Sequence, residues 1–263
     1  MDKQNDTSAR GVELKPFYKE DSITLFLGDC RSILPELSGL ESVITDPVWP
    51  NASPNLQGRE DPSGLLRDMC LMLPRDTERL VIQMGCDSDP RFLDGIPSRW
   101  AFLRVCWLDY ARPSYKGRLL YTGDVAYAFG QPPAFIPGRQ VMSGMCRSSR
   151  SDRLFERHTK ANVHKKEFTA PDGLPHPCAR RLQHVEWLVH QFSDTAVCDP
   201  FMGSGTTGVA AKKYGRTFIG IEIEEKYCQL AADRIRKTQK GYNGRFDIDG
   251  SPTPPPDSES VKS

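Results

Sequence analysis

The amino-acid sequence predicts an α/β protein built on a doubly wound, mostly parallel sheet. Three observations predict this class. Short apolar runs alternate with segments of helical period along residues 22–129 and again along 182–239. The 263-residue chain is 38% apolar, which is enough for a sizeable core. A strand at 195–201 leads through a glycine-rich loop into a helix, as in parallel sheets that bind ligands.

The remaining strands and helices are predicted in the same way, from short apolar runs and from segments of helical period. Residues 1–20 are expected to form a flexible lead-in and residues 241–263 a disordered tail, since both are polar and the tail is rich in proline. Residues 21–240 are expected to be one domain. Thr122-Gly123-Asp124 separates two apolar runs and predicts a hairpin turn, which adds an antiparallel hairpin strand on the C-terminal side of the sheet. The expected strands are 22–29, 41–47, 79–85, 101–109, 119–121, 125–129, 195–201 and 216–222, and the expected helices are 30–37, 63–73, 182–192, 206–214 and 224–239.

A basic segment interrupts this periodicity. The net charge is only +1, but residues 138–166 hold eight Lys or Arg against two acids, which leaves the rest of the chain acidic. Such a segment suits a polyanionic partner, and a solvated loop is the alternative. The basic residues are Arg139, Arg147, Arg150, Arg153, Arg157, Lys160, Lys165 and Lys166.

The eight cysteines do not suggest a disulfide framework or a zinc site. No C-x-x-C pair occurs, and the polar start MDKQNDTSAR predicts no secretory signal. We therefore expect reduced cytosolic thiols, mostly in the core, and no metal. No apolar run approaches the roughly 20 residues of a membrane helix.

The strongest motif is D-P-F-M-G-S-G-T-T-G at 199–208, between a strand and a helix. It fits G-x-G-x-x-G, so a dinucleotide-binding oxidoreductase is one interpretation and a purely structural turn is another. However, Asp199 would repel a pyrophosphate and would suit a cationic ligand. Glu222 ends the next strand, where its carboxylate can accept hydrogen bonds from two ribose hydroxyls. S-adenosylmethionine combines a nucleoside with a positive charge.

Five segments, in order, resemble the permuted beta class of DNA amino-methyltransferases, the N6-adenine/N4-cytosine family. The resemblance implies a Rossmann-like methyltransferase fold over residues 21–240, with a small irregular insertion at 130–175 for DNA recognition. The segments are F-L-G-D-C-R-S-I-L-P-E-L (26–37), I-T-D-P-V-W (44–49), H-P-C-A-R-R (176–181), D-P-F-M-G-S-G-T-T-G-V-A-A (199–211) and F-I-G-I-E (218–222).

The resemblance also implies a binding site for S-adenosylmethionine. Asp29 should contact the adenine, although an ordinary strand-end cap is its alternative role, and Glu222 should hold the ribose. The segment from His176 to Arg180 resembles the H-P-x-x-[KR]-P motif beside the methionine moiety, with Arg181 in place of its last proline. The full expected set is Asp29, His176, Pro177, Arg180, Asp199, Pro200, Phe201, Gly203, Ser204, Gly205, Thr206, Thr207 and Glu222.

T-D-P-V-W at 45–49 is the expected catalytic motif, with Asp46, Pro47, Val48 and Trp49. The exocyclic amine of adenine or cytosine is a poor nucleophile, because its lone pair is delocalised into the ring. The Asp46 carboxylate and the Pro47 carbonyl can accept its N–H groups and stabilise the developing positive charge. Trp49 can stack on a base flipped out of the duplex. Val48 stands at the family's second proline, and a strand-end turn with a buried tryptophan is the alternative.

An aspartate at the first motif position is typical of adenine enzymes, so we expect N6-adenine methylation, with N4-cytosine as the alternative. A non-catalytic DNA-binding relative is a third interpretation, and C5-cytosine chemistry is disfavoured. Double-stranded DNA is the expected partner, with a cytoplasmic location, no membrane and a homodimer left open. Any restriction endonuclease would be a separate chain. The expected DNA contacts are Arg139, Arg147, Arg150, Arg153, Lys160, Lys165 and Lys166, and Lys116 and Arg118 are further candidates.

Overall fold

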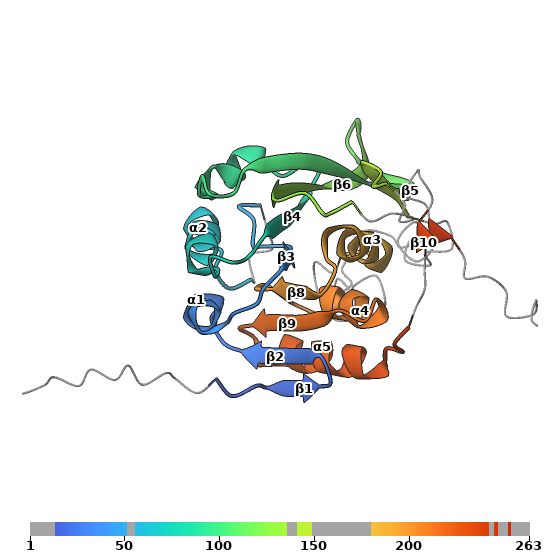
Figure 1. The fold of residues 1–263 in the computed structure, drawn as a ribbon. Coiled ribbons are helices and arrows are strands. Elements are labelled where there is room, and N and C mark those ends of the chain that lie inside the picture. Colours follow the sequence, from blue (N-terminus) through green and yellow to red (C-terminus); the bar gives the residue numbers. More distant parts are fainter. Residues whose placement is uncertain are drawn as a thin grey trace, which may run out of the picture.

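A nine-stranded sheet with helices on both faces forms the body of the protein, which confirms the predicted fold class (Figure 1). The computed structural model describes residues 14–51, 56–135, 141–148 and 180–241, together with two short strands at 245–246 and 252–253. The spatial order of the strands is β1-β2-β9-β8-β3-β4-β6-β5-β7. The strands are β1 (Tyr18–Glu20), β2 (Ile23–Leu27), β3 (Ser42–Thr45), β4 (Arg79–Gly85), β5 (Phe102–Lys116), β6 (Leu119–Gly130), β7 (Met145–Arg147), β8 (Ala196–Asp199) and β9 (Thr217–Glu222). The helices are α1 (Cys30–Ile33), α2 (Pro62–Met72), α3 (Leu182–Phe192), α4 (Thr206–Lys213) and α5 (Glu225–Lys237), and short 3-10 helices span Leu34–Glu36 and Pro90–Gly95.

Five adjacent strands, β2, β9, β8, β3 and β4, run parallel in the centre of the sheet. Their sequences are mostly short apolar runs, because helices cover both faces of these strands. Strands β8 and β9 come from late in the chain but lie between β2 and β3. The carboxyl ends of all five strands therefore meet at one edge of the sheet, where parallel α/β proteins bind their ligands.

Two apolar cores, one on each face, hold the layers together. Helices α1 and α2 pack on one face, where Leu66 and Met69 are buried against Leu80 and Ile82. Helices α3, α4 and α5 cover the other face, around the buried side chain of Trp187. Figure 1 shows the two groups of helices on opposite sides of the strands. Fully burying side chains of this size contributes about 1.5–3 kcal/mol each relative to leaving them exposed.

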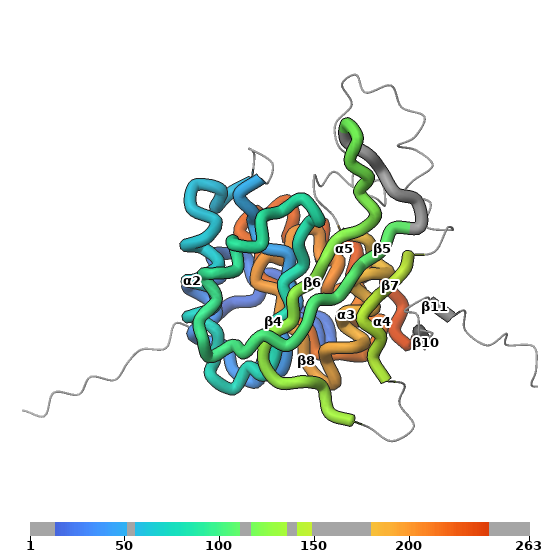
Figure 2. The backbone as a smooth tube through the Cα atoms, turned by 90° about the horizontal axis from the view of Figure 1, so that it is seen from above, coloured from blue at the N-terminus to red at the C-terminus, as the bar shows by residue number. Residues whose placement is uncertain are grey.

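The predicted hairpin turn at Thr122-Gly123-Asp124 is wrong, because these residues lie inside the single long strand β6. The chain turns instead at Gly117, which has a φ of +61°. Gly123 allows β6 to pair closely with β5, because a Cβ there would lie 2.4 Å from the carbonyl oxygen of Leu108 on β5. Close approach of two strands, rather than a turn, explains this glycine. The predicted antiparallel hairpin strand corresponds to β6, which lies between β4 and β5. The hairpin of β5 and β6 extends beyond the body of the sheet (Figure 2).

Ordered structure begins earlier and ends later than predicted. Within the expected lead-in, Tyr18–Glu20 form β1, which pairs antiparallel with β2. Within the expected tail, β10 (Arg245–Phe246) pairs with β11 (Pro252–Thr253) as a two-stranded ribbon. Backbone pairing explains both differences, since short polar segments can join a sheet edge or each other without an apolar pattern. Residues 1–13, the other residues of 242–251 and residues 254–263 lie outside the described part.

The cysteines of the described part are free thiols, and all but Cys86 are buried. The predicted packing role of these residues is therefore confirmed there, while Cys178 lies outside the described residues. No helix among the described residues is long and apolar enough to cross a membrane.

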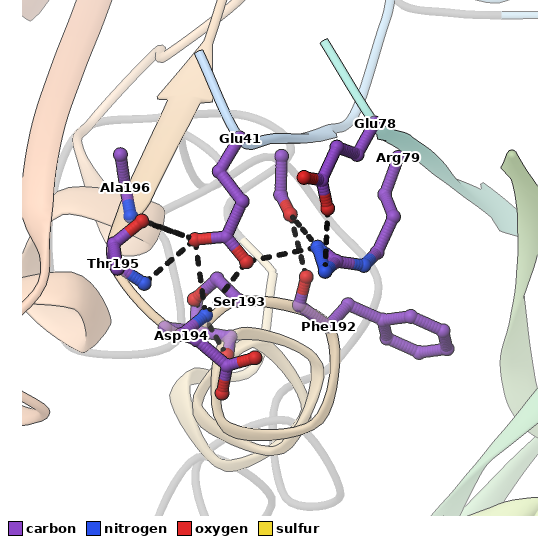
Figure 3. A network of polar contacts seen from close by, with 10 residues as sticks. Glu41, Glu78, Arg79, Phe192, Ser193, Asp194, Thr195 and Ala196 are labelled. Carbon is purple, nitrogen blue, oxygen red and sulfur yellow. Dashed lines mark hydrogen bonds and ion pairs between the residues drawn. The ribbon is translucent and has the colours of Figure 1, made fainter. Parts of the chain in front are cut away.

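A partly buried polar network joins elements at the edge of the sheet opposite the carboxyl ends of the parallel strands (Figure 3). The Glu41 carboxylate accepts hydrogen bonds from the backbone N–H groups of Asp194, Thr195 and Ala196, at 2.6–3.1 Å. It also pairs with the buried guanidinium of Arg79 at 2.8 Å. The network ties the start of β4 to the connection between α3 and β8, so these elements hold fixed positions at the opposite edge.

Candidate functional site

Four acidic side chains lie at the carboxyl ends of four neighbouring strands. Asp29 follows β2, Glu222 ends β9, Asp199 ends β8 and Asp46 follows β3. All four line one cavity of about 290 Å³. Glu60 and Glu224 also line the cavity, so acidic groups there outnumber the two arginines, Arg31 and Arg180, which favours a cationic ligand over a pyrophosphate.

The glycine loop is placed between β8 and α4 as predicted. Gly203 and Gly205 have φ values of +52° and +79°, which other residues rarely adopt. A Cβ on Gly205 would also lie 2.6 Å from the Cβ of Ala231 on α5, so the loop packs directly against that helix. The loop lines the cavity with backbone atoms and with Ser204 and Thr206. It can therefore approach a ligand closely.

Asp199 is buried and organises the loop. Its carboxylate accepts hydrogen bonds from the hydroxyls of Thr45 and Thr207, each at 2.6 Å, and from the N–H of Phe201 at 3.1 Å. Burial raises the pKa of Asp199, and these three donors oppose the rise. Thr45 is a residue that sequence reasoning missed, although it begins the T-D-P-V-W motif. It connects the end of β3 to the end of β8.

Glu222 is held by the backbone on both sides. Its carboxylate accepts the N–H of Gly203 and the N–H of Glu224, each at 2.8 Å. Burial raises the pKa of Glu222, and the two N–H groups oppose this effect. Each carboxylate oxygen can accept more than one hydrogen bond, so hydroxyl groups of a ligand can still bind here.

The position of Asp29 is compatible with both of its candidate roles, because Asp29 caps helix α1 and also lines the cavity. Its carboxylate accepts the N–H of Arg31 at 2.9 Å at the start of α1. It also forms an ion pair with the Arg31 guanidinium, which lowers the pKa of Asp29. Asp29 therefore caps helix α1 at the end of β2, and contact with a ligand stays a prediction.

The predicted catalytic residues Asp46, Pro47, Val48 and Trp49 all line the cavity, beside Arg180. The Arg180 guanidinium donates two hydrogen bonds to the Asp46 carboxylate, at 2.7 and 3.0 Å. Its central carbon lies 4.2 Å from the centre of the Trp49 ring. Burial raises the pKa of Asp46 to about 7, while the Arg180 charge acts in the opposite direction.

Arg180 was expected beside the methionine moiety of a cofactor, but its contacts lie with the catalytic motif. A third hydrogen bond, of 2.9 Å, runs from Arg180 to the carboxylate of Asp124 on β6. Asp124 is buried, with 8% of its side chain exposed. Sequence reasoning missed Asp124 because T-G-D was interpreted as a turn.

Gln83 and Arg234 are two further residues that the sequence did not reveal. Gln83 lies on β4, lines the cavity and is 3% exposed. Its amide nitrogen has no hydrogen-bond partner among the described residues. Arg234 lies on α5 and donates to the carbonyl of Ser204 at 2.6 Å and to the hydroxyl of Thr206 at 3.2 Å. A glutamine inside an apolar strand was the available signal for the first residue. The helical period of α5 gave none for the second.

Most of the predicted DNA contacts lie outside the described residues. Arg147 is the exception: it ends β7, is 56% exposed and lies 3.8 Å from the carboxylate of Asp109. Its exposure is compatible with phosphate binding. Outside the described part are the cofactor candidates His176 and Pro177 and the DNA candidates Arg139, Arg150, Arg153, Lys160, Lys165 and Lys166.

Comparisons with known proteins point to one group of enzymes. Residues 139–233 match the model of a family described as DNA methylase. The type II methyltransferase M2.LlaDCHI of Lactococcus lactis subsp. cremoris is 56% identical over 41 residues, which are 16% of this chain and 15% of that protein. The orphan methyltransferase M.BamHII of Bacillus amyloliquefaciens is 36% identical over 84 residues, 32% of this chain and 30% of that protein. The matched segments thus span less than a third of these relatives.

Two solved structures illustrate the proteins that share this fold. The complex of M1.HpyAVI with SAM aligns over 81% of this chain and 99% of its own, with a TM-score of 0.55 and 20% identity. The cytosine-N4-specific PvuII DNA methyltransferase aligns over 84% of this chain and 89% of its own, with a TM-score of 0.59 and 17% identity. At these identities the likeness establishes the shared fold.

Proposed function

We propose that the protein methylates DNA, on the premise that residues 139–233 match the family described as DNA methylase. The reaction transfers a methyl group from S-adenosylmethionine to the exocyclic amine of a flipped base in double-stranded DNA, with adenine N6 as the target. One observation carries the proposal: the Asp46 carboxylate and the Trp49 ring share a cavity with the glycine loop between β8 and α4. An amine acceptor and a stacking platform therefore lie beside a nucleoside-type cofactor site.

The cavity suits S-adenosylmethionine by its charge and by its hydrogen-bond acceptors. That cofactor supplies an electrophilic methyl group on a cationic sulfonium. Asp199 and the other strand-end carboxylates favour its positive charges, while Glu222 retains acceptor capacity for ribose hydroxyls. Gly203 and Gly205 let the loop backbone approach closely. A dinucleotide fits less well, because these carboxylates would repel its pyrophosphate.

Asp46 acts on the amine of the base. Ionised, it accepts one N–H of the amine, and the Pro47 carbonyl accepts the other, so that the nitrogen becomes pyramidal and its lone pair points at the methyl group. The carboxylate also stabilises the positive charge that develops on nitrogen, and the proton can leave after methyl transfer. Trp49 holds the base by stacking, which is worth about 1–3 kcal/mol per base in single-strand binding.

The basic segment supports DNA as the substrate. Residues 138–166 carry eight Lys or Arg, and Arg147 within it is exposed. These residues can bind phosphates and place the duplex over the cavity. Cytosine N4 is the second candidate target, because its amine would meet the same acceptors.

Nucleoside mass spectrometry tests the proposal. Purified protein is incubated with S-adenosylmethionine and unmethylated DNA of varied sequence, and the DNA is then digested to nucleosides. We expect N6-methyladenine. Detection of N4-methylcytosine would keep the mechanism and replace the base, whereas the absence of any methylated nucleoside would reject the proposal.

Replacing Asp46 by alanine should abolish methyl transfer and leave the dissociation constant for S-adenosylmethionine within a few-fold of the original. Asp46 serves the amine rather than the cofactor, so only the chemical step is affected. Initial rates and calorimetric cofactor titration measure the two effects. Asp94→Ala, at an exposed position outside the cavity, is the matched control. Normal turnover in Asp46→Ala would remove Asp46 from this role.

A further inference from the structure

Resting on the proposed function, we infer that Gln83 determines which bases the pocket accepts. Its amide N–H donates to the ring nitrogen beside the target amine, while Asp46 accepts from the amine itself. Together the two side chains would read one edge of the flipped base.

The strand register places Gln83 beside Asp46. Thr45 at the end of β3 pairs in parallel with Ile82 on β4, so the next residue along each chain is Asp46 and Gln83. Neighbouring strands lie roughly 4.8 Å apart, and side chains at matched positions point to the same face. Both side chains line the same cavity. The two side chains therefore line the cavity from neighbouring positions.

The Gln83 amide has an unused donor. The side chain is 3% exposed, and its nitrogen has no hydrogen-bond partner among the described residues. Leaving such a buried group unpaired costs about 1–3 kcal/mol, so native proteins rarely retain one without a ligand or ordered water. A buried donor that lines a binding cavity points to an acceptor on the bound molecule.

The Arg180 guanidinium indicates where that molecule lies. It is planar, it stacks on Trp49, and its N–H groups donate to Asp46. A base with an exocyclic amine would make the same two contacts, so guanidinium and base exclude each other at Asp46. Asp124 retains Arg180 through the remaining hydrogen bond when the base enters. Gln83 lies on β4. That strand runs between β3, which Asp46 follows, and β6, which carries Asp124.

The chemistry of the four bases gives this pair its selectivity. Adenine and cytosine each place an amine donor next to a ring-nitrogen acceptor on their Watson–Crick edge. Guanine and thymine place a carbonyl acceptor next to a ring N–H donor. An acceptor from Asp46 beside a donor from Gln83 complements the first pattern and opposes the second. Sites that hydrogen-bond a substrate group discriminate strongly against molecules that lack it.

The test uses an oligonucleotide with the recognition sequence mapped from the methylated DNA. Its target base is either natural or a deaza analogue that lacks the ring nitrogen, 1-deazaadenine or 3-deazacytosine. With the natural base, Gln83→Leu should lower kcat/KM roughly tenfold, the size of one lost hydrogen bond. With the analogue, wild type and Gln83→Leu should have similar rates, because the hydrogen bond is absent from both.

Two controls keep the outcome interpretable. Gln229→Leu, at an exposed position on α5, should behave as wild type toward both bases. Unchanged cofactor binding shows that Gln83→Leu is folded, and Gln83→Glu, which adds a second acceptor, should lower kcat/KM further. Equal penalties for the analogue in wild type and Gln83→Leu would overturn the role of Gln83. A wild type inactive on natural DNA would instead reject the proposed methyltransferase function.

Discussion

At the scale of single residues, the balance around Asp46 is the feature most open to experiment. Burial raises the pKa of Asp46 to about 7, and the Arg180 charge limits that rise. Both side chains are largely buried, with 22% and 13% exposed. In the proposed reaction the ionised Asp46 carboxylate accepts the amine N–H, so this pKa predicts an activity that changes near neutral pH.

Replacing Arg180 by glutamine should move the acidic limb of the pH–rate profile to higher pH. Losing the nearby positive charge raises the pKa of Asp46 further, so a higher pH is needed to ionise it. A shift of about one to three pH units is expected for an opposite charge at this distance. The profile of kcat/KM against pH, which reports the free enzyme where Arg180 contacts Asp46, is compared between Arg180→Gln and Arg91→Gln, where the arginine is 84% exposed. An unmoved limb would show that Arg180 does not control Asp46.

Sequence reasoning worked for residues within short motifs and failed for contacts between distant ones. T-D-P-V-W and the glycine loop are short motifs that predict a shared site, and Asp46, Trp49 and Asp199 do line one cavity. The bond between Arg180 and Asp46 joins residues 134 positions apart, and a single sequence carries no signal for such a pair. Gln83 was missed for a related reason: only its neighbours in space make its amide notable.

At the scale of elements, the glycine loop depends on helix α5. Arg234 donates to the Ser204 carbonyl, the Ser204 hydroxyl and the Thr206 hydroxyl, at 2.6–3.2 Å. Gly205 packs against Ala231 of the same helix. The helix therefore holds the loop in place, and its own Tyr227 lines the cavity.

Replacing Arg234 by methionine should weaken binding of S-adenosylmethionine about tenfold, the value of one charge-assisted hydrogen bond, and change kcat less. Arg234 positions the loop without touching the reacting atoms, so its loss affects cofactor affinity first. Calorimetry and steady-state kinetics separate the two effects, and Arg234→Lys should restore part of the affinity. Arg236→Met, on the same helix with its guanidinium on Asp233, is the control. A larger effect on kcat than on cofactor affinity would contradict this assignment.

The elements themselves were predicted with uneven success, for physical reasons. The strand at 79–85 and the helix at 182–192 were placed correctly to the residue, because apolar period and flanking polar residues agree there. The hairpin failed because a glycine needed for close strand contact resembles a turn glycine. Strand β1 was missed because it is a short edge strand, which pairs with β2 alone among the described strands.

At the scale of the whole molecule, stability depends on the network of Glu41 (Figure 3). Burial raises the pKa of Glu41, but hydrogen bonds from Thr195, Asp194 and Ala196 outweigh that effect and leave the pKa below its usual value. A lowered pKa means that the ionised carboxylate stabilises the fold. That contribution is complete above the usual pKa and is lost as the pH falls through the lowered one.

Replacing Glu41 by glutamine should lower the free energy of unfolding at pH 7 by about 3 kcal/mol, as for a broken buried ion pair. The loss leaves the Arg79 charge with Glu78 as its remaining carboxylate partner. Urea unfolding measures the difference, which should shrink as the pH is lowered below 4.5, since wild type then loses the same contribution. Glu225→Gln, at an exposed position in the first turn of α5, is the control. A difference that does not depend on pH would exclude the ionised carboxylate as the cause.

The insertion of β8 and β9 between β2 and β3 has a consequence for biosynthesis. On a ribosome, β2 and β3 emerge long before the two strands that pair with them. Until residues 196–222 are made, both early strands present unpaired backbone that could associate with other chains. The centre of the sheet therefore cannot form during most of translation. The cavity forms only when the last third of the polypeptide, which contains β8 and β9, has been synthesised.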